Sequence, residues 1–423
     1  MTPQAKEDGQ GNLAAWGSWP IALAGLVALA VAMGIGRFAF TPLLPMMLRD
    51  GVVDLPGASW LASANYLGYM LGALLCTLQP WIWSRVRGLP LLGFSALVRF
   101  GLLATGVLTL AMAWQAPAFW PLLRFASGMV SAVVFVYTSG WCLSQLARRG
   151  VPAMGGIIYA GPGAGIAVSG LLASGMVAWQ WSAATGWLIF GVLAFGLSAT
   201  VWRILRGGDE RLQALSLPGS SAGTQADKPT VKSDSGEMAL FALAYGLAGF
   251  GYIITATFLP VIARAALPGS AWLDLFWPIF GVGVMIGALL AASLPHGSDF
   301  RVRLVVCYVL QALGIVSSVW SPSLAGFAIG SLLVGLPFTA ISFFAMQEAR
   351  RLRPLAAASA IGLITATYGV GQVLGPPLVA LLLRRSANAG AGFTLSLEIA
   401  ACALLLGAAL YAWLIKAYPL TTR

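Results

Sequence analysis

Twelve long apolar stretches, separated by short polar connections, constrain the fold of this chain more than any other feature of its sequence. Each is long enough for a helix that crosses the roughly 30 Å hydrocarbon core of a bilayer, which takes about 20 residues. We therefore predict an all-α polytopic membrane protein. The expected spans cover residues 19–48, 58–80, 89–114, 117–145, 153–179, 182–205, 238–263, 271–294, 304–320, 324–347, 356–383 and 393–416.

Composition excludes the other broad classes of protein. Hydrophobic residues make up 59% and charged residues 9% of the 423 residues, which leaves too little polar surface to solvate a soluble globule. The apolar stretches also lack the alternation of a membrane β-barrel, and open sheet edges do not survive in lipid. The first apolar stretch is far longer than the core of a signal peptide, so we expect it to remain as a span.

Histidine and cysteine give no sign of a metal, redox or catalytic site. The single histidine, His296, falls in a polar connection, and the cysteines lack the close spacing of metal-binding or redox pairs. We interpret the cysteines as small packing residues. We expect neither an enzyme nor a cofactor. The four cysteines are Cys76, Cys142, Cys307 and Cys402.

The distribution of positive charge predicts the orientation in the membrane. Of the 24 lysines and arginines, 17 lie in the two tails and in the connections that follow even-numbered spans, and only four lie on the opposite side. The positive-inside rule then places both termini in the cytoplasm, and we expect a bacterial-type inner membrane. These loops account for the net charge of +11, so nucleic acid is not an expected partner.

A polar stretch from 207 to 236 divides the chain into two related halves. We expect a cytoplasmic tail at 1–18, six-helix bundles at 19–206 and 237–416 with the linker between them, and a tail at 417–423. A shift of 215 positions pairs similar residues, and the six intervening spans give both halves the same orientation. The repeat pairs Gly34 with Gly249, Gly36 with Gly251, Pro45 with Pro260, Gly68 with Gly283, and MLGALL at 70–75 with MIGALL at 285–290.

Two parallel six-helix bundles resemble the architecture of the major facilitator superfamily, and three motifs carry the resemblance further. The run from Arg124 to Gly128 is similar to its R-x-x-x-G element, and Gly161 to Gly165 resembles its G-P-x-x-G antiporter motif, although Ile166 replaces a further glycine. GIGRFAFTPLLP at 34–45 resembles the signature of the YbfB/YjiJ-type branch. The connection after the second span departs from the superfamily pattern because it lacks the usual aspartate.

Arginines inside spans are the first candidates for a binding site. An arginine at bilayer depth costs roughly 2.5–3.5 kcal/mol on insertion scales, so it usually faces protein or water. The resemblance places the helices of Arg37 and Arg124 along a cavity between the halves, where each could bind a ligand or lock helices together. For Arg99 we favour structural pairing. Further candidates for contact with substrate are Tyr252, at the repeat position of Arg37, and Asn65, Tyr159 and Gln372.

Glycine and proline mark two candidate hinges. Gly161, Pro162 and Gly163 lie in the fifth span, and Gly375 and Pro376 end a polar face of the eleventh. A gating hinge and a simple kink both fit this pattern.

The scarcity of acids inside the spans predicts the sign of the substrate. Only Asp274 and Glu398 fall within the expected spans, both near the outer ends of their helices. A transporter of organic cations usually needs a deep acid, because an isolated charge in a low dielectric is costly. Arginine with hydroxyl groups suits an anion instead. We therefore predict a secondary transporter of a small organic anion, such as a carboxylate, with Asp274 and Glu398 as possible proton carriers.

Two alternatives stay open. The Gly-Pro motif favours a drug/proton antiporter that exports hydrophobic compounds, although the deep acid is missing. A membrane receptor that transports nothing is the second alternative. The sequence contains no Walker loop, which disfavours transport driven by ATP. The expected partners are a small-molecule substrate and the lipid bilayer, and we expect a monomer.

Overall fold

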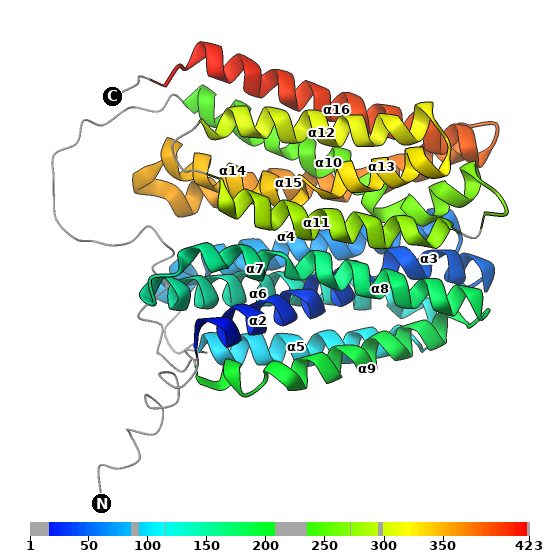
Figure 1. Ribbon diagram of the computed structural model, residues 1–423, viewed down its shortest axis with the longest axis horizontal. Coiled ribbons are helices and arrows are strands. Elements are labelled where there is room, and N and C mark those ends of the chain that lie inside the picture. The colour runs from blue at the N-terminus through cyan, green and yellow to red at the C-terminus, as the bar shows by residue number, and fades with distance from the viewer. Residues whose placement is uncertain are drawn as a thin grey trace, which may run out of the picture.

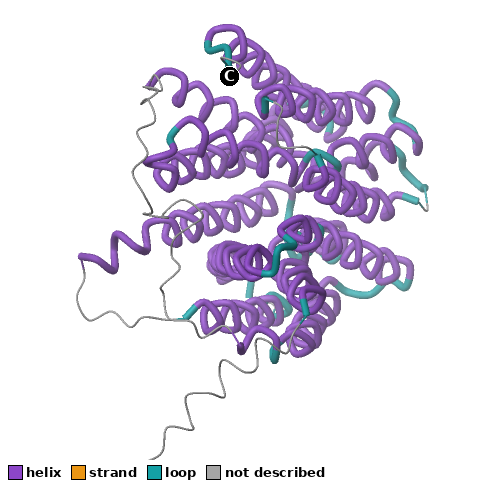
Figure 2. Tube along the Cα trace, turned by 60° about the vertical axis from the view of Figure 1, so that its left-hand side comes forward, coloured by secondary structure: helices purple, strands orange, loops and turns teal. Residues whose placement is uncertain are grey.

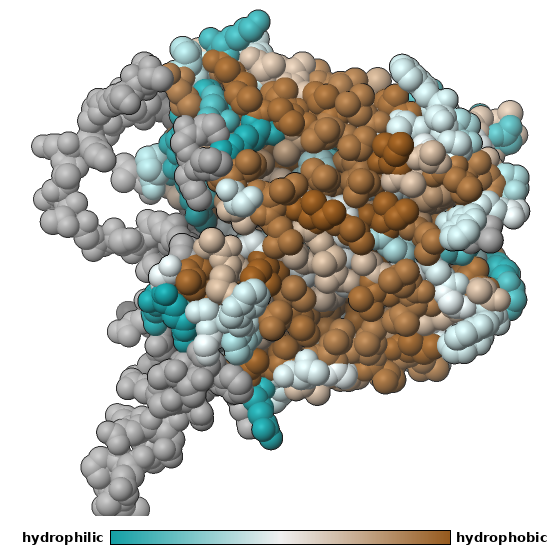
Figure 3. Space-filling view, in the orientation of Figure 1, coloured by the Kyte–Doolittle hydropathy of each residue, from teal (hydrophilic) through white to brown (hydrophobic). Residues whose placement is uncertain are grey.

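A computed structural model describes residues 17–85, 93–114, 116–207, 235–270, 272–294 and 299–420. Within these ranges all regular structure is helical, as Figure 2 shows. Twelve helical segments are long and apolar enough to cross a membrane. The face drawn in Figure 3 carries a broad apolar belt between two more polar ends, as expected for a protein that lies in a bilayer.

The spans agree with the sequence-based predictions, with the ends displaced by a few residues. The main helices are α2 (Ser18–Leu29), α3 (Phe40–Arg49), α4 (Leu55–Arg85), α5 (Phe94–Ala111), α6 (Trp120–Arg148), α7 (Gly155–Tyr159), α8 (Gly161–Ala178), α9 (Ala183–Val201), α10 (Ser235–Ala266), α11 (Phe276–Ser293), α12 (Phe300–Trp320), α13 (Leu324–Gly335), α14 (Phe338–Leu352), α15 (Ala357–Arg385) and α16 (Ala389–Ala417).

The helices form two groups that lie side by side. In Figure 1, α2 to α9 occupy one half and α10 to α16 the other. We call the end at which α9 finishes and α10 begins the linker end, and we call the opposite end the distal end. Helix α2 begins and helix α16 finishes at the linker end.

The expected linker lies outside the described residues from 208 to 234, and the expected 1–18 tail lies outside them up to residue 16. In spans 1 and 7, 83% of the most apolar 18-residue window is buried inside the protein. These two spans therefore lie at the centre of the helix bundle.

Repeat-related glycines make equivalent contacts in the two halves. A Cβ atom at Gly68 would meet the backbone of Phe125 on α6, the fourth span. Its repeat partner Gly283 would meet the backbone of Leu332 on α13, which belongs to the tenth span. Because four and ten are equivalent spans, the sequence repeat is also a repeat of packing, with glycine allowing the close backbone approach.

Three of the spans are interrupted. Span 1 contains a π-helix, Ala30–Arg37, which ends before α3 begins at Phe40. Span 5 is interrupted at Ala160, between α7 and α8, and span 10 is interrupted at Leu336 and Pro337, between α13 and α14. In contrast, α15 continues through Gly375 and Pro376, where the polar face was expected to end at a helix break. Gly375 packs against Ile253 of α10, and such packing supports a proline inside a membrane helix.

A buried group of charges ties the second half together at the linker end. The Arg301 guanidinium, 1% exposed, lies 2.9 Å from Asp299 and 3.6 Å from both Glu237 and Glu348. It also donates to the backbone carbonyls of Leu414 and Tyr418.

The expectation that only two acids lie within the membrane spans was wrong. Spans 7 and 10 extend further than predicted, and they include Glu237 and Glu348 at their ends.

Candidate functional site

The interruption of span 1 creates the centre of the candidate site. A π-helix closes its hydrogen bonds over five residues, as Phe38 N–H does to the Met33 carbonyl at 3.0 Å. The α-helix resumes only at Phe40, so carbonyl groups at the end of the π-helix need other donors. In a membrane those donors must come from the protein itself.

Helix α6 supplies these donors. The Arg124 guanidinium donates to the carbonyls of Gly36 at 3.3 Å and of Arg37 at 3.0 Å. The Ser127 hydroxyl donates to Gly36 at 2.6 Å, and Ser131 to Ala32 at 2.8 Å. Side chains at intervals of three and four residues on one face of α6 therefore support the turn in span 1. These contacts make Arg124 a brace for the backbone that presents Arg37.

The Arg37 side chain lies among aromatic rings at the boundary between the halves. It is 2% exposed. Its guanidinium carbon lies 3.9 Å from the centre of the Tyr69 ring and 5.2 Å from that of Tyr66, both on α4. Aromatic faces attract a cation, and the attraction grows when both groups are desolvated. The rings thus partly offset the cost of burying this positive charge.

One amide joins two residues that are equivalent in the repeat. Arg37 Nη2 donates to Gln372 Oε1 at 2.7 Å. The Nε2 group of the same amide donates to the Tyr252 hydroxyl. Arg37 belongs to span 1, Tyr252 to α10 and Gln372 to α15, so this chain of bonds crosses from one half to the other. The structure therefore brings together three of the six predicted substrate-binding residues.

Among the residues that the structure describes, the charge of Arg37 has no carboxylate partner. The ion pairs among the described residues involve other arginines, and the Arg37 Nε group is buried without a hydrogen-bond acceptor. The Thr255 hydroxyl, one helical turn after Tyr252, is also buried without a partner. A guanidinium offers five N–H donors. The site thus has unused capacity for an acceptor group, and the charge favours an anionic one.

Contacts between the halves close the distal side of Arg37. The Thr41 hydroxyl donates to the Ala256 carbonyl at 2.8 Å, and the hydroxyls of Tyr66 and Thr257 are 2.8 Å apart. The Phe38 ring packs against Trp277 and Phe338, with centroids 6.2 and 6.0 Å apart. These hydrogen bonds and rings separate Arg37 from the distal end.

Toward the linker end, tyrosines form a stack. The rings of Tyr245 and Tyr368 are 4.6 Å apart at 25°, and those of Tyr368 and Tyr252 are 5.8 Å apart at 18°. Tyr69 and Tyr368 are half-buried, whereas Thr41 and Tyr66 on the distal side are buried. Tyr69 and Tyr368 are thus more exposed than the distal residues, whereas Tyr245 and Tyr252 of the stack are buried.

The remaining predicted substrate ligands lie farther from this chain of bonds. Asn65 is buried and donates to the Arg124 carbonyl at 2.9 Å, which joins α4 to α6. Tyr159 ends α7, where its ring packs against Phe135 at 6.0 Å. Sequence reasoning did not select Tyr66 and Tyr69 as ligands. The i and i+3 spacing of two tyrosines on the polar face of α4 is the signal that could have found them.

The glycines of the fifth span face two different partners. A Cβ atom at Gly161 would lie 2.3 Å from the Leu26 carbonyl oxygen, and one at Gly165 would lie 2.4 Å from that of Ala30, both in span 1. A Cβ atom at Gly163 would instead lie 2.6 Å from the Gly281 carbonyl oxygen on α11. Gly163 is therefore at the contact between the halves.

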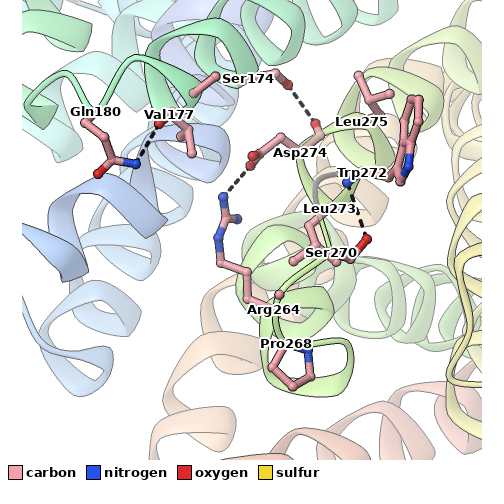
Figure 4. A pocket seen from close by; sticks show the side chains of 12 residues that line it. Ser174, Val177, Gln180, Arg264, Pro268, Ser270, Trp272, Leu273, Asp274 and Leu275 are labelled. Carbon is pink, nitrogen blue, oxygen red and sulfur yellow. Dashed lines mark hydrogen bonds and ion pairs between the residues drawn. The ribbon is translucent and has the colours of Figure 1, made fainter.

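Neither acid predicted to carry a proton lies beside Arg37. Asp274 lies at the distal end, 2.5 Å from the Arg264 guanidinium, and its backbone carbonyl accepts a hydrogen bond from Ser174 of the other half (Figure 4). A cavity of about 690 Å³ adjoins this ion pair. Glu398 is exposed on the outside of α16. Arg99, as expected, has structural contacts, with the Ser95 carbonyl and the Trp202 ring.

Comparison with protein families identifies the chain. A model of the family described as the uncharacterised MFS-type transporter YbfB matches residues 29–412. The chain belongs to this family of major facilitator superfamily transporters. It is a secondary transporter rather than an enzyme, as the sequence predicted. The comparison with curated proteins gives no significant match.

Solved structures show the fold of this YbfB-type transporter in other proteins. A mutant of the nucleoside transporter NupG superposes with a TM-score of 0.69 at 15% sequence identity, and the match covers 94% of this chain and 100% of NupG. Another NupG structure gives a TM-score of 0.65 at 15% identity, with coverage of 94% and 99%. At this identity the likeness establishes the fold alone.

Proposed function

We propose that this transporter moves a small organic anion by alternating access, with Arg37 binding the negative group of the substrate. The observation that carries the proposal is a buried guanidinium at the boundary between the halves that forms no ion pair among the described residues. Burial without a counter-ion is costly, and a substrate carboxylate would supply the missing charge.

The contacts of Gln372 suggest how binding is linked to movement. Its oxygen accepts from Arg37 in one half, and its nitrogen donates to Tyr252 in the other. A carboxylate that binds Arg37 replaces the amide oxygen as acceptor, which changes a bond between the halves. A ligand shifts a conformational equilibrium only through different contacts in the two states, and this exchange of acceptors provides such a difference.

We infer that the proposed site is approached from the linker end in this conformation. Hydrogen bonds and aromatic contacts close the distal side, while Tyr69 and Tyr368 are half-buried on the other. With both termini in the cytoplasm, as the distribution of lysine and arginine suggests, the conformation faces inward. Asp274 is paired at the distal end and Glu398 faces outward, so we include neither acid in the central mechanism.

A ligand-stability screen tests the substrate class. Purified protein in detergent would be heated with carboxylates, amino acids or hydrophobic cations at equal concentrations. A ligand that binds the native state raises apparent stability by mass action, so weak binding is still detected. We expect carboxylates to stabilise the protein. Stabilisation by hydrophobic cations alone would support the drug antiporter and contradict the anion proposal.

Substitution of Arg37 tests the role of the charge. In Arg37→Gln we expect binding of the stabilising carboxylate to weaken by about 2–5 kcal/mol, the range for breaking a buried charged contact. Arg37→Lys should retain part of the affinity, because it keeps the charge but loses the planar fork. The matched control is Arg99→Gln, which removes a half-buried arginine of α5 outside the site. Unchanged affinity in monodisperse Arg37→Gln would refute the proposal.

A further inference from the structure

Arg350 is a further arginine that forms no ion pair among the described residues. It lies two residues before the end of α14, at the linker end, and its side chain is half-buried. Its Nε group is buried without a hydrogen-bond acceptor, and the ion pairs near the end of α14 involve other arginines. A buried donor without an acceptor is costly. The Arg350 guanidinium therefore has capacity for an acceptor that the described residues do not supply.

The acid nearest to Arg350 in sequence binds other arginines. Glu348 accepts from Arg351 at 2.5 and 2.8 Å, and it lies 3.6 Å from Arg301. Successive residues of an α-helix are rotated by about 100°, so Glu348 and Arg350, two residues apart, point to nearly opposite sides of α14. Arg350 therefore faces away from the charge cluster that ties the second half together.

Two hydroxyl groups of the first half lie on the side that Arg350 faces. Tyr159, the last residue of α7, is close enough to Arg350 for an electrostatic interaction across the boundary between the halves. Ser139 of α6 is next to Tyr159, and its buried hydroxyl forms no hydrogen bond. A guanidinium, a phenol and a serine hydroxyl thus converge from α14, α7 and α6, and each can donate a hydrogen bond.

The internal repeat shows that the first half has no equivalent of this arrangement. QLARR at 145–149 ends span 4 and QEARR at 347–351 ends span 10, and a proline follows each at the same distance. Arg148 takes the place of Arg350 in the first copy, and its side chain is exposed. The repeat is therefore broken where an arginine faces the boundary between the halves.

Polar groups also connect this region with the central site. Tyr159 is within electrostatic reach of Tyr69 as well as of Arg350. The ring centre of Tyr69 lies 3.9 Å from the guanidinium carbon of Arg37. Tyr159, a predicted substrate ligand that does not touch Arg37, thus links the two arginines.

We propose that Arg350, Tyr159 and Ser139 form a second anion-binding site, between the linker end and Arg37, for the carboxylate or sulfonate group of a small organic anion. We call it the entry site. The guanidinium supplies the charge, and the hydroxyls supply hydrogen bonds, which are stronger to an ionised acceptor. Passage of the anion from the entry site to Arg37 rests on the proposed function, whereas anion binding at the entry site does not.

Thiol reagents of opposite charge test the entry site without knowledge of the substrate. Two reporters place a thiol on either side of it. Met346→Cys lies one turn before Arg350 on α14, and Ser139→Cys lies across the boundary. Both would carry Cys402→Ser, because Cys402, expected to be a packing residue, is exposed, whereas the other three cysteines are buried.

The measured quantity is the preference of each reporter for an anionic reagent. The thiolate attacks sulfonatoethyl methanethiosulfonate, which is anionic, or its cationic trimethylammonium analogue; a mixed disulfide forms and methanesulfinate leaves. We expect the ratio of anionic to cationic rates to exceed that of free cysteine by at least about threefold, the effect of one nearby unit charge in a water-like dielectric. A ratio equal to that of free cysteine at both reporters would overturn the entry site.

Two arginines at equivalent repeat positions provide the matched control. Arg350→Gln should lower the anion preference at least about threefold, and Arg350→Lys should retain most of it, because lysine keeps the charge. Arg148→Gln changes the net charge equally but should leave the preference nearly unchanged, since water and salt screen an exposed charge. Equal losses in Arg350→Gln and Arg148→Gln would show a general surface potential and overturn the proposal.

Protection distinguishes binding of an anion from its mere attraction. Benzoate should slow the reaction of the reporters with neutral methyl methanethiosulfonate. Benzyltrimethylammonium, of similar size and opposite charge, should not. Absence of benzoate protection at both reporters would overturn the entry site, as would protection that survives Arg350→Gln but is lost in Arg37→Gln. Benzoate protection that requires Arg350, together with unchanged carboxylate affinity in Arg37→Gln, would instead refute the proposed function and support the entry site.

Discussion

Thr41 on α3 donates a 2.8 Å hydrogen bond to the backbone carbonyl of Ala256 on α10, and these residues are equivalent positions of the internal repeat. A contact between equivalent positions lies close to the axis that relates the two halves. The bond is on the distal side of Arg37, where Tyr66 and Thr257 also join the halves. Its presence therefore reports that the distal side is closed.

Removing this bond should favour opening of the distal side. In Thr41→Val we expect the equilibrium to shift about threefold, since polar contacts between membrane helices average about 0.6 kcal/mol. The rate at which a distal cysteine reacts with a membrane-impermeant thiol reagent would measure the shift. Ser198→Ala is the control, because the Ser198 hydroxyl bonds only within its own helix, to Ala194. Equal effects in both variants would contradict a role for Thr41 in closure.

The fold could be predicted from sequence because the constraints on it are local and repeated. A bilayer requires about 20 apolar residues for each crossing, and Gly68 and Gly283 showed the repeat before their contacts were known. Span ends were less certain, because polar residues can continue a helix beyond the apolar core. This is why Glu348, four residues before the end of α14, was not expected inside a span.

The candidate site could be predicted only in part. Apolar surroundings and charge identified Arg37, and repeat symmetry identified Tyr252. The sequence could not reveal that a π-helix in span 1 would direct Arg124 to backbone carbonyls, because π-helical turns have no simple residue signature. It also could not show the face on which Glu398 lies. The direction of a side chain depends on how all twelve spans pack.

Arg124 should affect stability more than binding. Arg124→Gln removes charged donors from the carbonyls of Gly36 and Arg37, so we expect a loss of about 1.5–3 kcal/mol and a lower thermal midpoint in detergent. Ser131→Ala removes one neutral bond to Ala32 and should cost less. Folded Arg124→Gln protein should bind the stabilising carboxylate with nearly normal affinity. A stable variant that has lost affinity would instead support direct contact between Arg124 and substrate.

The charge cluster at the linker end should be sensitive to the loss of one acid. Glu348 is buried and accepts from Arg351, and it also lies 3.6 Å from Arg301. Glu348→Gln leaves buried positive charge less compensated, so we expect a loss of about 3 kcal/mol in stability. Arg385→Gln, which removes an exposed charge, should change stability by less than about 0.5 kcal/mol. Similar thermal midpoints in the two variants would show that Glu348 is not required to hold the second half together.

The glycine at the contact between the halves should control movement rather than folding. A Cβ atom at Gly163 would lie 2.6 Å from the Gly281 carbonyl oxygen, whereas one at Gly175 on the same helix would have no heavy atom within 4 Å. Gly163→Ala and Gly163→Leu must therefore separate α8 from α11 in this conformation, while Gly175→Ala need not. Overpacking costs about 1–3 kcal/mol, which is at least about fivefold in the population of the closely packed state. We expect normal abundance in the membrane and at least fivefold slower uptake into proteoliposomes of the carboxylate that stabilises the protein. Gly175→Ala should transport at the wild-type rate. If Gly163→Ala instead abolishes folded protein, the contact with Gly281 is static packing that both conformations keep.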